Sequence, residues 1–188
     1  MEQRILPAPN HTCDFFSDDT HLVTTVAAAL RPAFALRHGV IVIATPQHLA
    51  AIDAQLDSFA ALRAAKASGL YLPLDADDTL AKLSTAGRPD RRKFERAVGT
   101  PVAEALARYG GVRAYGEMVS LLWMRGQHEA AIELEELWNE LIGYHPIALL
   151  CGYAAQGFPG GLSTEGAARV ARAHAGFGLA AHAEAAGE

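Results

Sequence analysis

The sequence predicts a three-layer α/β fold in which a mostly parallel sheet is flanked by helices. Two continuous apolar runs, at residues 40–44 and 147–151, are typical of strands buried on both faces. Residues 128–142 give the clearest amphipathic helix, with an apolar stripe on one side and glutamates on the other. Because strand-like and helix-like segments alternate along the chain, we expect the strands to run parallel.

The remaining expected elements follow in chain order: a strand at 13–16, a helix at 21–30, a helix beginning at Thr45-Pro46, a strand at 70–74, helices at 77–83 and 98–109, a strand at 112–115, and a helix at about 167–175. Pro32 is expected to kink or end the helix before it, or to start a short second one, because proline has no backbone N–H. We expect one domain over residues 11–160, preceded by a flexible start (1–10) and followed by a C-terminal helix and frayed tail (161–188).

Composition narrows the class of protein. The chain has 188 residues, of which 51% are hydrophobic and 20% charged, as in an ordinary globular domain. Its formal net charge of −5 argues against direct nucleic-acid binding. The most apolar stretch, residues 39–44, is too short to cross a membrane, and the first ten residues lack the apolar core of a secretory signal. We therefore expect a cytoplasmic protein, with no membrane partner, whose two cysteines form no structural disulfide.

None of the candidate loops has the chemistry of a phosphate loop. Such a loop needs glycines, a lysine for the phosphates and a hydroxyl for magnesium. The turn at residues 16–21 has two adjacent carboxylates and no glycine or lysine, the turn at 44–48 is no better, and the glycines at 157–161 have the wrong spacing. Orthodox ATP hydrolysis is therefore not expected, and a degenerate nucleotide-binding enzyme is kept as an alternative.

Imidazole and thiol groups raise a second possibility. His11 and Cys13 are two positions apart in a predicted strand, so both side chains lie on one face, and Cys151 comes at the end of another strand. Imidazole and thiolate are ligands for zinc, copper(I) or haem iron. His11, Cys13 and Cys151 are accordingly candidate ligands for a metal or haem. In the alternative interpretation, Cys151 is a small packed side chain and His11 lines a polar pocket by hydrogen bonding.

Arg113 and Glu117 flank a predicted strand end. In an open parallel sheet, ligands bind beyond the carboxyl ends of the strands, where a carboxylate at the start of a helix can contact them. The equally weighted alternative is a capping carboxylate and a structural ion pair. No Gly-x-Ser-x-Gly elbow is present.

Two charged segments are candidate contact surfaces for another protein. Residues 88–96 are mostly basic, and the helix at 128–142 has an acidic side formed by Glu129, Glu133, Glu136 and Glu140. Each is also consistent with an ordinary solvated surface.

Several motifs resemble those of one known family, the MEDS domain (methanogen/methylotroph, dichloromethane-regulator sensory domain). They are His11-Thr-Cys13-Asp-Phe15-Phe16, Val112-Arg113-Ala-Tyr-Gly116-Glu117-Met118-Val-Ser-Leu121-Leu122-Trp123, Glu133-Leu134-Glu135-Glu136-Leu137-Trp138-Asn139 and Leu149-Leu150-Cys151-Gly152-Tyr153. The resemblance extends from about residue 11 to residue 158, and the second and third motifs are its specific part.

This resemblance implies a RecA-like or clock-ATPase-like fold that has lost its phosphate loop. It also implies a sensory role, since family members occur alone or joined to histidine kinases and DNA-binding regulators and are proposed to sense small molecules such as simple hydrocarbon derivatives. Two positions depart from the family pattern: Phe16 stands where tyrosine is usual, and Val40 stands where an acidic residue is common. Both weaken a ligand assignment carried over from the family.

We therefore predict a non-catalytic sensory domain that binds a small molecule or partner protein and regulates a separate histidine kinase or transcription regulator. A homodimer is a candidate assembly. Its predicted ligand-binding residues are His11, Cys13, Phe16, Arg113, Glu117, Cys151 and Tyr153. The alternatives are a metal- or haem-dependent redox sensor using His11, Cys13 and Cys151, and the degenerate nucleotide-binding enzyme.

Overall fold

The computed structural model describes residues 10–56, 62–174 and 176–177, and its centre is a six-stranded parallel sheet. The strand order is β3-β2-β6-β7-β1-β8. The strands are β1 (His11–Phe16), β2 (Gly39–Ala44), β3 (Tyr71–Asp75), β6 (Val112–Gly116), β7 (Ile147–Ala154) and β8 (Gly176–Phe177). Two short strands, β4 (Ser84–Thr85) and β5 (Arg88–Pro89), form a separate antiparallel pair.

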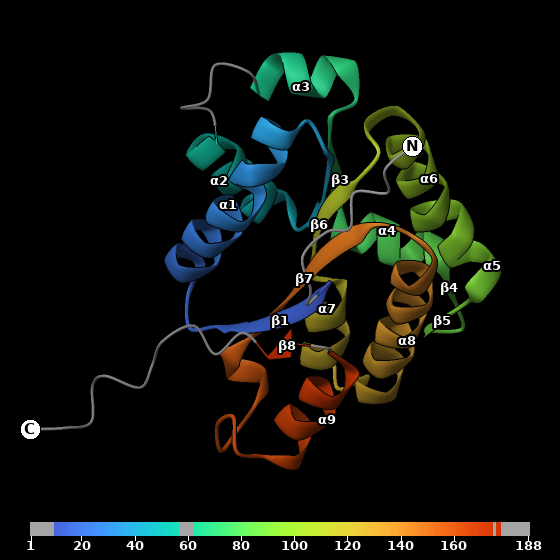
Figure 1. Ribbon diagram of the computed structural model, residues 1–188. Helices are drawn as coiled ribbons and strands as arrows, with labels where there is room; N and C mark the ends of the chain where they lie inside the picture. The colour runs from blue at the N-terminus through green and yellow to red at the C-terminus, as the bar shows by residue number, and fades with distance from the viewer. Residues whose placement is uncertain (1–9, 57–61, 175, 178–188) are drawn as a thin grey trace, which may run out of the picture.

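Helices cover both faces of the sheet (Figure 1). One face is covered by α1 (Asp19–Leu36), α2 (Pro46–Leu56) and α3 (Leu62–Ser68). The other is covered by α4 (Ala76–Leu83), α5 (Arg91–Phe94), the π-helical turn η1 (Glu95–Gly99), α6 (Thr100–Tyr109), α7 (Met118–Met124), α8 (His128–Tyr144) and α9 (Glu165–Ala173). A short 3-10 turn, η2 (Ala155–Gly157), follows β7. This arrangement confirms the three-layer α/β fold with a mostly parallel sheet.

Pro32 does not end the first helix, because α1 continues through it to Leu36. Leu30 and Ala33, on either side of the proline, are 1% and 0% exposed. Their burial against the sheet compensates for the backbone hydrogen bond that proline cannot donate. Tertiary packing therefore decides this helix end.

Strand alternation separates the interior into two cores. Cys13 and Phe15 of β1 face α7, α8 and α9, and Cys151 and Tyr153 of β7 share that core. Phe16 belongs to the other core, beneath α1 and α2. β1 and β7 pair in register, with Cys13 opposite Cys151 and Phe15 opposite Tyr153. Neighbouring residues of one strand, such as Phe15 and Phe16, therefore pack into different cores.

The two charged segments that are candidate contact surfaces also bind each other. Arg88 pairs with Glu133 and Arg91 pairs with Glu140, which joins the basic segment to the acidic side of α8. Arg169 of α9 pairs with Glu129 at 2.8 Å. A partner surface at either segment stays a prediction, but many of these charges already have partners within the domain.

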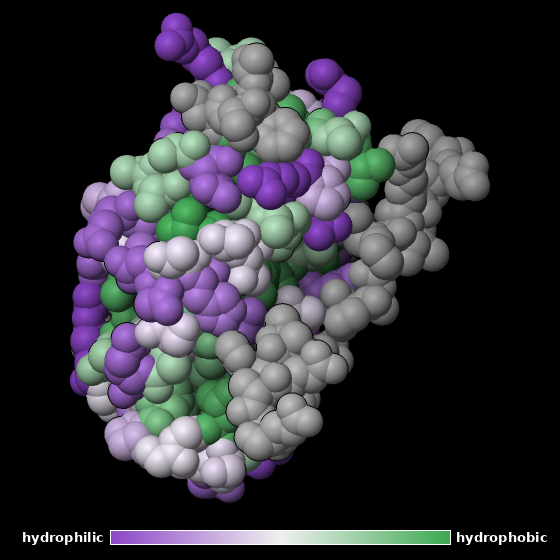
Figure 2. All heavy atoms as spheres, turned by 90° about the vertical axis from the view of Figure 1, so that its left-hand side faces the viewer, coloured by the Kyte–Doolittle hydropathy of each residue, from purple (hydrophilic) through white to green (hydrophobic). Residues whose placement is uncertain are grey.

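The outer surface over α1 and α2 is mixed in character. Figure 2 shows hydrophilic and hydrophobic residues interspersed in small patches on this side of the molecule. Within the part of the chain that the structure describes, every helix is too short or too polar to span a membrane.

Candidate functional site

A cavity of about 160 Å³ opens at the carboxyl ends of β1, β6 and β7, and we call it the strand-end pocket. Its position is where open parallel sheets bind ligands, because several loops and helix starts meet there. The pocket is lined by Phe16, Asp18, Asp19, Leu22, His48, Tyr115, Glu117, Ser120, Leu121, Met124, Gly152, Tyr153, Ala154 and Gln156.

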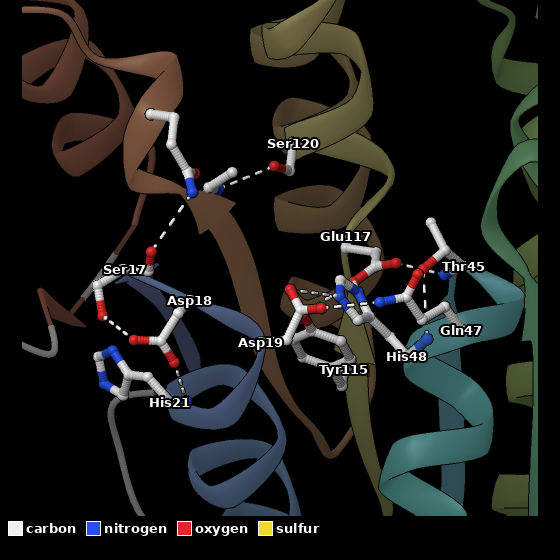
Figure 3. A network of polar contacts seen from close by, with 12 residues as sticks. Ser17, Asp18, Asp19, His21, Thr45, Gln47, His48, Tyr115, Glu117 and Ser120 are labelled. Carbon is white, nitrogen blue, oxygen red and sulfur yellow. Dashed lines mark hydrogen bonds and ion pairs between the residues drawn. The ribbon is translucent and has the colours of Figure 1, made fainter.

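Glu117 is the polar centre of this pocket (Figure 3). It follows β6 directly and is 4% exposed. Its carboxylate accepts hydrogen bonds from the backbone N–H of Thr45, from His48 Nδ1 at 2.7 Å and from the Tyr115 hydroxyl at 3.3 Å. It does not cap its own helix, α7, with a side-chain hydrogen bond. Instead, the carboxylate lies at the start of α2, where the positive end of the helix dipole stabilises it.

His48 connects Glu117 to Asp19 (Figure 3). Its Nδ1 donates to Glu117, and its Nε2 lies 3.3 Å from Oδ1 of Asp19. The hydrogen bond to Glu117 raises the pKa of His48, burial opposes this, and Asp19 adds to the increase. Because ionised carboxylates only accept hydrogen bonds, two carboxylate partners favour the protonated imidazole, in which both ring nitrogens donate. Neither nitrogen is then free to accept a proton from a nucleophile.

The first turn of α1 makes the pocket acidic. Asp18 caps α1 by accepting from the backbone N–H of His21 at 2.8 Å, and this hydrogen bond lowers the pKa of Asp18. Glu117 and Asp19 flank the imidazole of His48, and Asp18 adds a third carboxylate to the pocket lining. This charge disfavours phosphate groups and anions in general.

Residue 152 must be a small residue, because Tyr115 and Phe16 occupy the space that a side chain would need. A Cβ at this position would overlap the Tyr115 hydroxyl and would lie 2.9 Å from the ring of Phe16. The missing side chain leaves room for the Tyr115 hydroxyl over Gly152 of β7, where it donates to Glu117. A glycine in the middle of a strand is thus explained by close approach of a neighbouring side chain.

A second constellation lies between the sheet and α8 and α9, and we call it the buried cluster: His11, Glu135, Cys151 and His174. One ligand atom from each residue lies within 4.8 Å of all the others, and all four residues are buried. His11 Nε2 is 3.3 Å from Cys151 Sγ and 3.1 Å from Glu135 Oε2. Cys151 Sγ lies 3.3 Å from the same oxygen.

Glu135 is a fully buried carboxylate, with 0% exposure. Its Oε1 accepts a hydrogen bond from the Tyr153 hydroxyl at 2.7 Å and lies 3.2 Å from His174 Nε2. Burial alone raises the pKa of Glu135, but contacts with His11 and His174 lower it by more, so the pKa lies well below its usual range. Burial and the charge of Glu135 raise the pKa of the Cys151 thiol.

The structure divides the predicted site residues between these places. Phe16, Glu117 and Tyr153 line the strand-end pocket, and Tyr153 also contacts the buried cluster. His11 and Cys151 belong to the cluster, whereas Cys13 is its buried neighbour on β1. Arg113 is the second residue of β6, and its Nη1 donates to the carbonyl oxygen of Ala29 at 3.2 Å, apart from Glu117.

Sequence reasoning missed Glu135, His174, His48 and Asp19 as site residues. A signal for Glu135 was present: it lies four residues after Ala131 and three before Trp138, on the apolar stripe of α8. A carboxylate on that stripe needs a buried partner. Asp19 and His48 lie in the first turns of α1 and α2, whose sequences were considered only as phosphate loops. No local signal points to His174.

Comparison with known proteins agrees with the motifs. The family model described as MEDS, MEthanogen/methylotroph, DcmR Sensory domain, matches residues 10–175. The chain belongs to the MEDS family. The match confirms the resemblance found in the motifs, and MEDS is by its description a family of sensory domains. The matched range of this MEDS domain includes all four residues of the buried cluster and most of the described chain. No curated protein matches the sequence.

Proposed function

We propose that this MEDS domain is a non-catalytic sensor that binds a small, largely apolar molecule in the strand-end pocket and reports it to a partner protein. The observation that carries the proposal is the pocket itself, a largely apolar cavity at the strand ends whose polar groups include Glu117, His48 and Asp19. An apolar cavity of about 150 Å³ holds a molecule the size of benzene. The cavity of about 160 Å³ therefore suits a ligand of this size, not a nucleotide.

The charge of the pocket narrows the ligand further. Glu117 and Asp19 flank the imidazole of His48, and Asp18 adds a third carboxylate to the pocket lining, so a neutral or cationic ligand is favoured over an anionic one. Glu117 already accepts three hydrogen bonds, and the more exposed Asp19 is available to a polar group of the ligand. The expected ligand is a small hydrocarbon derivative with at most one hydroxyl or amino group.

Binding without catalysis is supported by the arrangement of the acid and base groups. A general base must have a free acceptor directed at the proton it removes. Both nitrogens of His48 are used by carboxylates, and the Ser120 hydroxyl accepts the backbone N–H of Ala154 at 2.9 Å. A ligand can instead shift α1 and α7, because both helices begin at the pocket. Such a shift would pass the signal to a partner.

Three probes of similar size and different charge test this proposal: benzyl alcohol, benzylamine and benzoate. Isothermal titration should show binding of the alcohol and the amine. Benzoate should bind at least about tenfold more weakly, because the carboxylates of the pocket repel its charge; tenfold corresponds to about 1.4 kcal/mol. Leu121→Trp should fill the pocket and abolish binding. Leu106→Trp is the matched control, because both leucines are partly buried against the same core but only Leu121 lines the pocket.

Three results would overturn the proposal. Equal binding of benzoate and benzylamine would show that the carboxylates do not select the ligand. Unchanged binding in the Leu121→Trp protein would place the ligand elsewhere. A folded protein that binds none of the three probes would refute the expected ligand class.

A further inference from the structure

The buried cluster brings together ligand atoms from four separate elements. His11 lies on β1, Glu135 on α8 and Cys151 on β7, and His174 follows α9. Figure 1 shows that α8, α9 and the β1–β7 part of the sheet meet on this side of the molecule. These residues are separated by up to 163 positions of sequence, and together they direct two imidazoles, one thiol and one carboxylate at a common point.

One ligand atom from each of the four residues lies within 4.8 Å of the other three, which is close enough for them to surround one ion after small side-chain movements. Bonds of about 2.0–2.3 Å to nitrogen, oxygen and sulfur place neighbouring ligand atoms about 3.3–3.6 Å apart around zinc. His11 Nε2, Cys151 Sγ and Glu135 Oε2 lie 3.1–3.3 Å from one another, and His174 Nε2 lies 3.2 Å from the other oxygen of Glu135. Small movements of these side chains would bring all four residues around one ion. A porphyrin does not fit this spacing, because the four donors converge on one point.

The outer nitrogen of each histidine is fixed by a hydrogen bond. His11 Nδ1 donates to Oδ1 of Asn139 at 2.7 Å, and Nδ2 of Asn139 donates to the carbonyl oxygen of Ala173 at 2.8 Å, which sets the orientation of the amide. His174 Nδ1 donates to the carbonyl oxygen of Val170 at 2.7 Å. Such partners hold metal-binding imidazoles in the correct tautomer and leave Nε2 with its lone pair directed at the ion.

His174 provides a second, independent indication of a ligand. Its side chain is 0% exposed, and its Nε2 forms no aligned hydrogen bond with any residue that the structure describes, although Glu135 Oε1 is 3.2 Å away. A buried polar atom without a hydrogen bond is costly. A metal–nitrogen bond would remove that cost.

Charge balance also favours a divalent cation. One thiolate and one carboxylate neutralise a doubly charged ion, and the two imidazoles bind as neutral ligands. The completed site would therefore carry no net charge, as a fully buried site requires. Four ligands from the protein fill the tetrahedron, which is typical of a structural centre.

We propose that His11, Glu135, Cys151 and His174 bind one divalent transition-metal ion, with zinc as the expected ion. The ion fastens the end of α9 to α8 and to strands β1 and β7. It is separate from the strand-end pocket, because none of the four cluster residues lines that pocket. Tyr153 connects the two places, because it lines the pocket and donates to Glu135.

The test uses the full chain without a histidine tag, loaded with zinc or cobalt(II) and freed of loosely bound metal. Elemental analysis should give one zinc ion per chain. The cobalt form should show the thiolate-to-cobalt charge-transfer band and the visible bands of a tetrahedral site. Cys151→Ser should abolish the charge-transfer band and weaken zinc binding at least about tenfold. Zinc should also raise the melting temperature of the wild type.

Cys13→Ser is the matched control. Cys13 pairs directly with Cys151 across the two strands and is equally buried, at 1% against 0%, but is not among the four converging residues. It should keep the cobalt bands. A band lost in Cys13→Ser and kept in Cys151→Ser would overturn the assignment.

The wild-type cobalt spectrum keeps the proposal testable if Cys151→Ser does not fold. A folded wild type without tetrahedral cobalt bands or bound zinc would refute the site. Leu121→Trp should leave the bands unchanged, so a failure of the metal site is distinguishable from a failure of the strand-end pocket.

Discussion

Replacing Glu117 by glutamine tests whether the carboxylate holds the strand-end pocket together through His48. Glutamine keeps the shape of the side chain and its carbonyl oxygen can still accept from Thr45. The hydrogen bond from His48 Nδ1 at 2.7 Å loses its charged acceptor. Hydrogen bonds to charged groups contribute about 1.5–3 kcal/mol. The bond from Tyr115, at 3.3 Å, adds little, so we expect a loss of about 2–3 kcal/mol in the free energy of unfolding at pH 6.

The loss should depend on pH because the folded state raises the pKa of His48. A histidine with a raised pKa stabilises the fold fully below its unfolded value of about 6.5, and this stabilisation disappears as the pH rises through the folded pKa. Glu117→Gln removes the largest cause of the increase. The difference between wild type and variant should therefore be large at pH 6 and small at pH 9.

Urea denaturation at the two pH values measures this difference, and thermal melting should show a decrease of about 4–10 °C at pH 6. Glu104→Gln is the control, since Glu104 is an exposed residue of α6, and its change should stay within about 0.5 kcal/mol. Equal destabilisation at pH 6 and pH 9 would refute the role assigned to His48.

Three further predictions concern other parts of the molecule. Gly152→Ala should lower the free energy of unfolding by about 1–3 kcal/mol, because the added methyl group overlaps Tyr115. Gly143→Ala, in an open part of α8, should raise it by up to about 1 kcal/mol. Chemical denaturation that gives both changes the same sign would contradict this. Asn139→Ala should weaken zinc binding about tenfold to a hundredfold in competition with a chelator, because His11 loses the partner of its Nδ1; unchanged affinity would show that Asn139 has no positioning role. Arg88→Ala should cost less than about 1 kcal/mol in denaturation, since its pair with Glu133 is exposed, and a larger loss would mean that the β5–α8 contact is more than a surface ion pair.

Much of the scaffold followed from local patterns. The β-branched run of β2 and the apolar run of β7 predicted buried parallel strands, and the stripe on α8 predicted its packing face. Thr45-Pro46 marked the start of α2 correctly. The position of Glu117 after β6 placed it at the strand ends, because the carboxyl ends of parallel strands share one edge.

The sites could not be predicted in full, because their residues meet only through packing. His48 reaches Glu117 across 69 positions of sequence, and His174 reaches Glu135 across α9. Arg113 was expected near Glu117, but the strand separates them by its length. The seven predicted residues were treated as one pocket, whereas alternation along β1 and β7 sends them to opposite faces of the sheet.

The sequence by itself predicted most of the sheet strands and the long helices in their chain order, because periodicity, capping and turn residues act over a few positions, and its motifs indicated the family. The tertiary structure decided which polar groups meet: it placed Glu135 in the core beside two histidines and enclosed a cavity beside Glu117. The physical reason is that a buried carboxylate is stable only with partners, and those partners come from distant elements brought together by the packing of helices on the sheet.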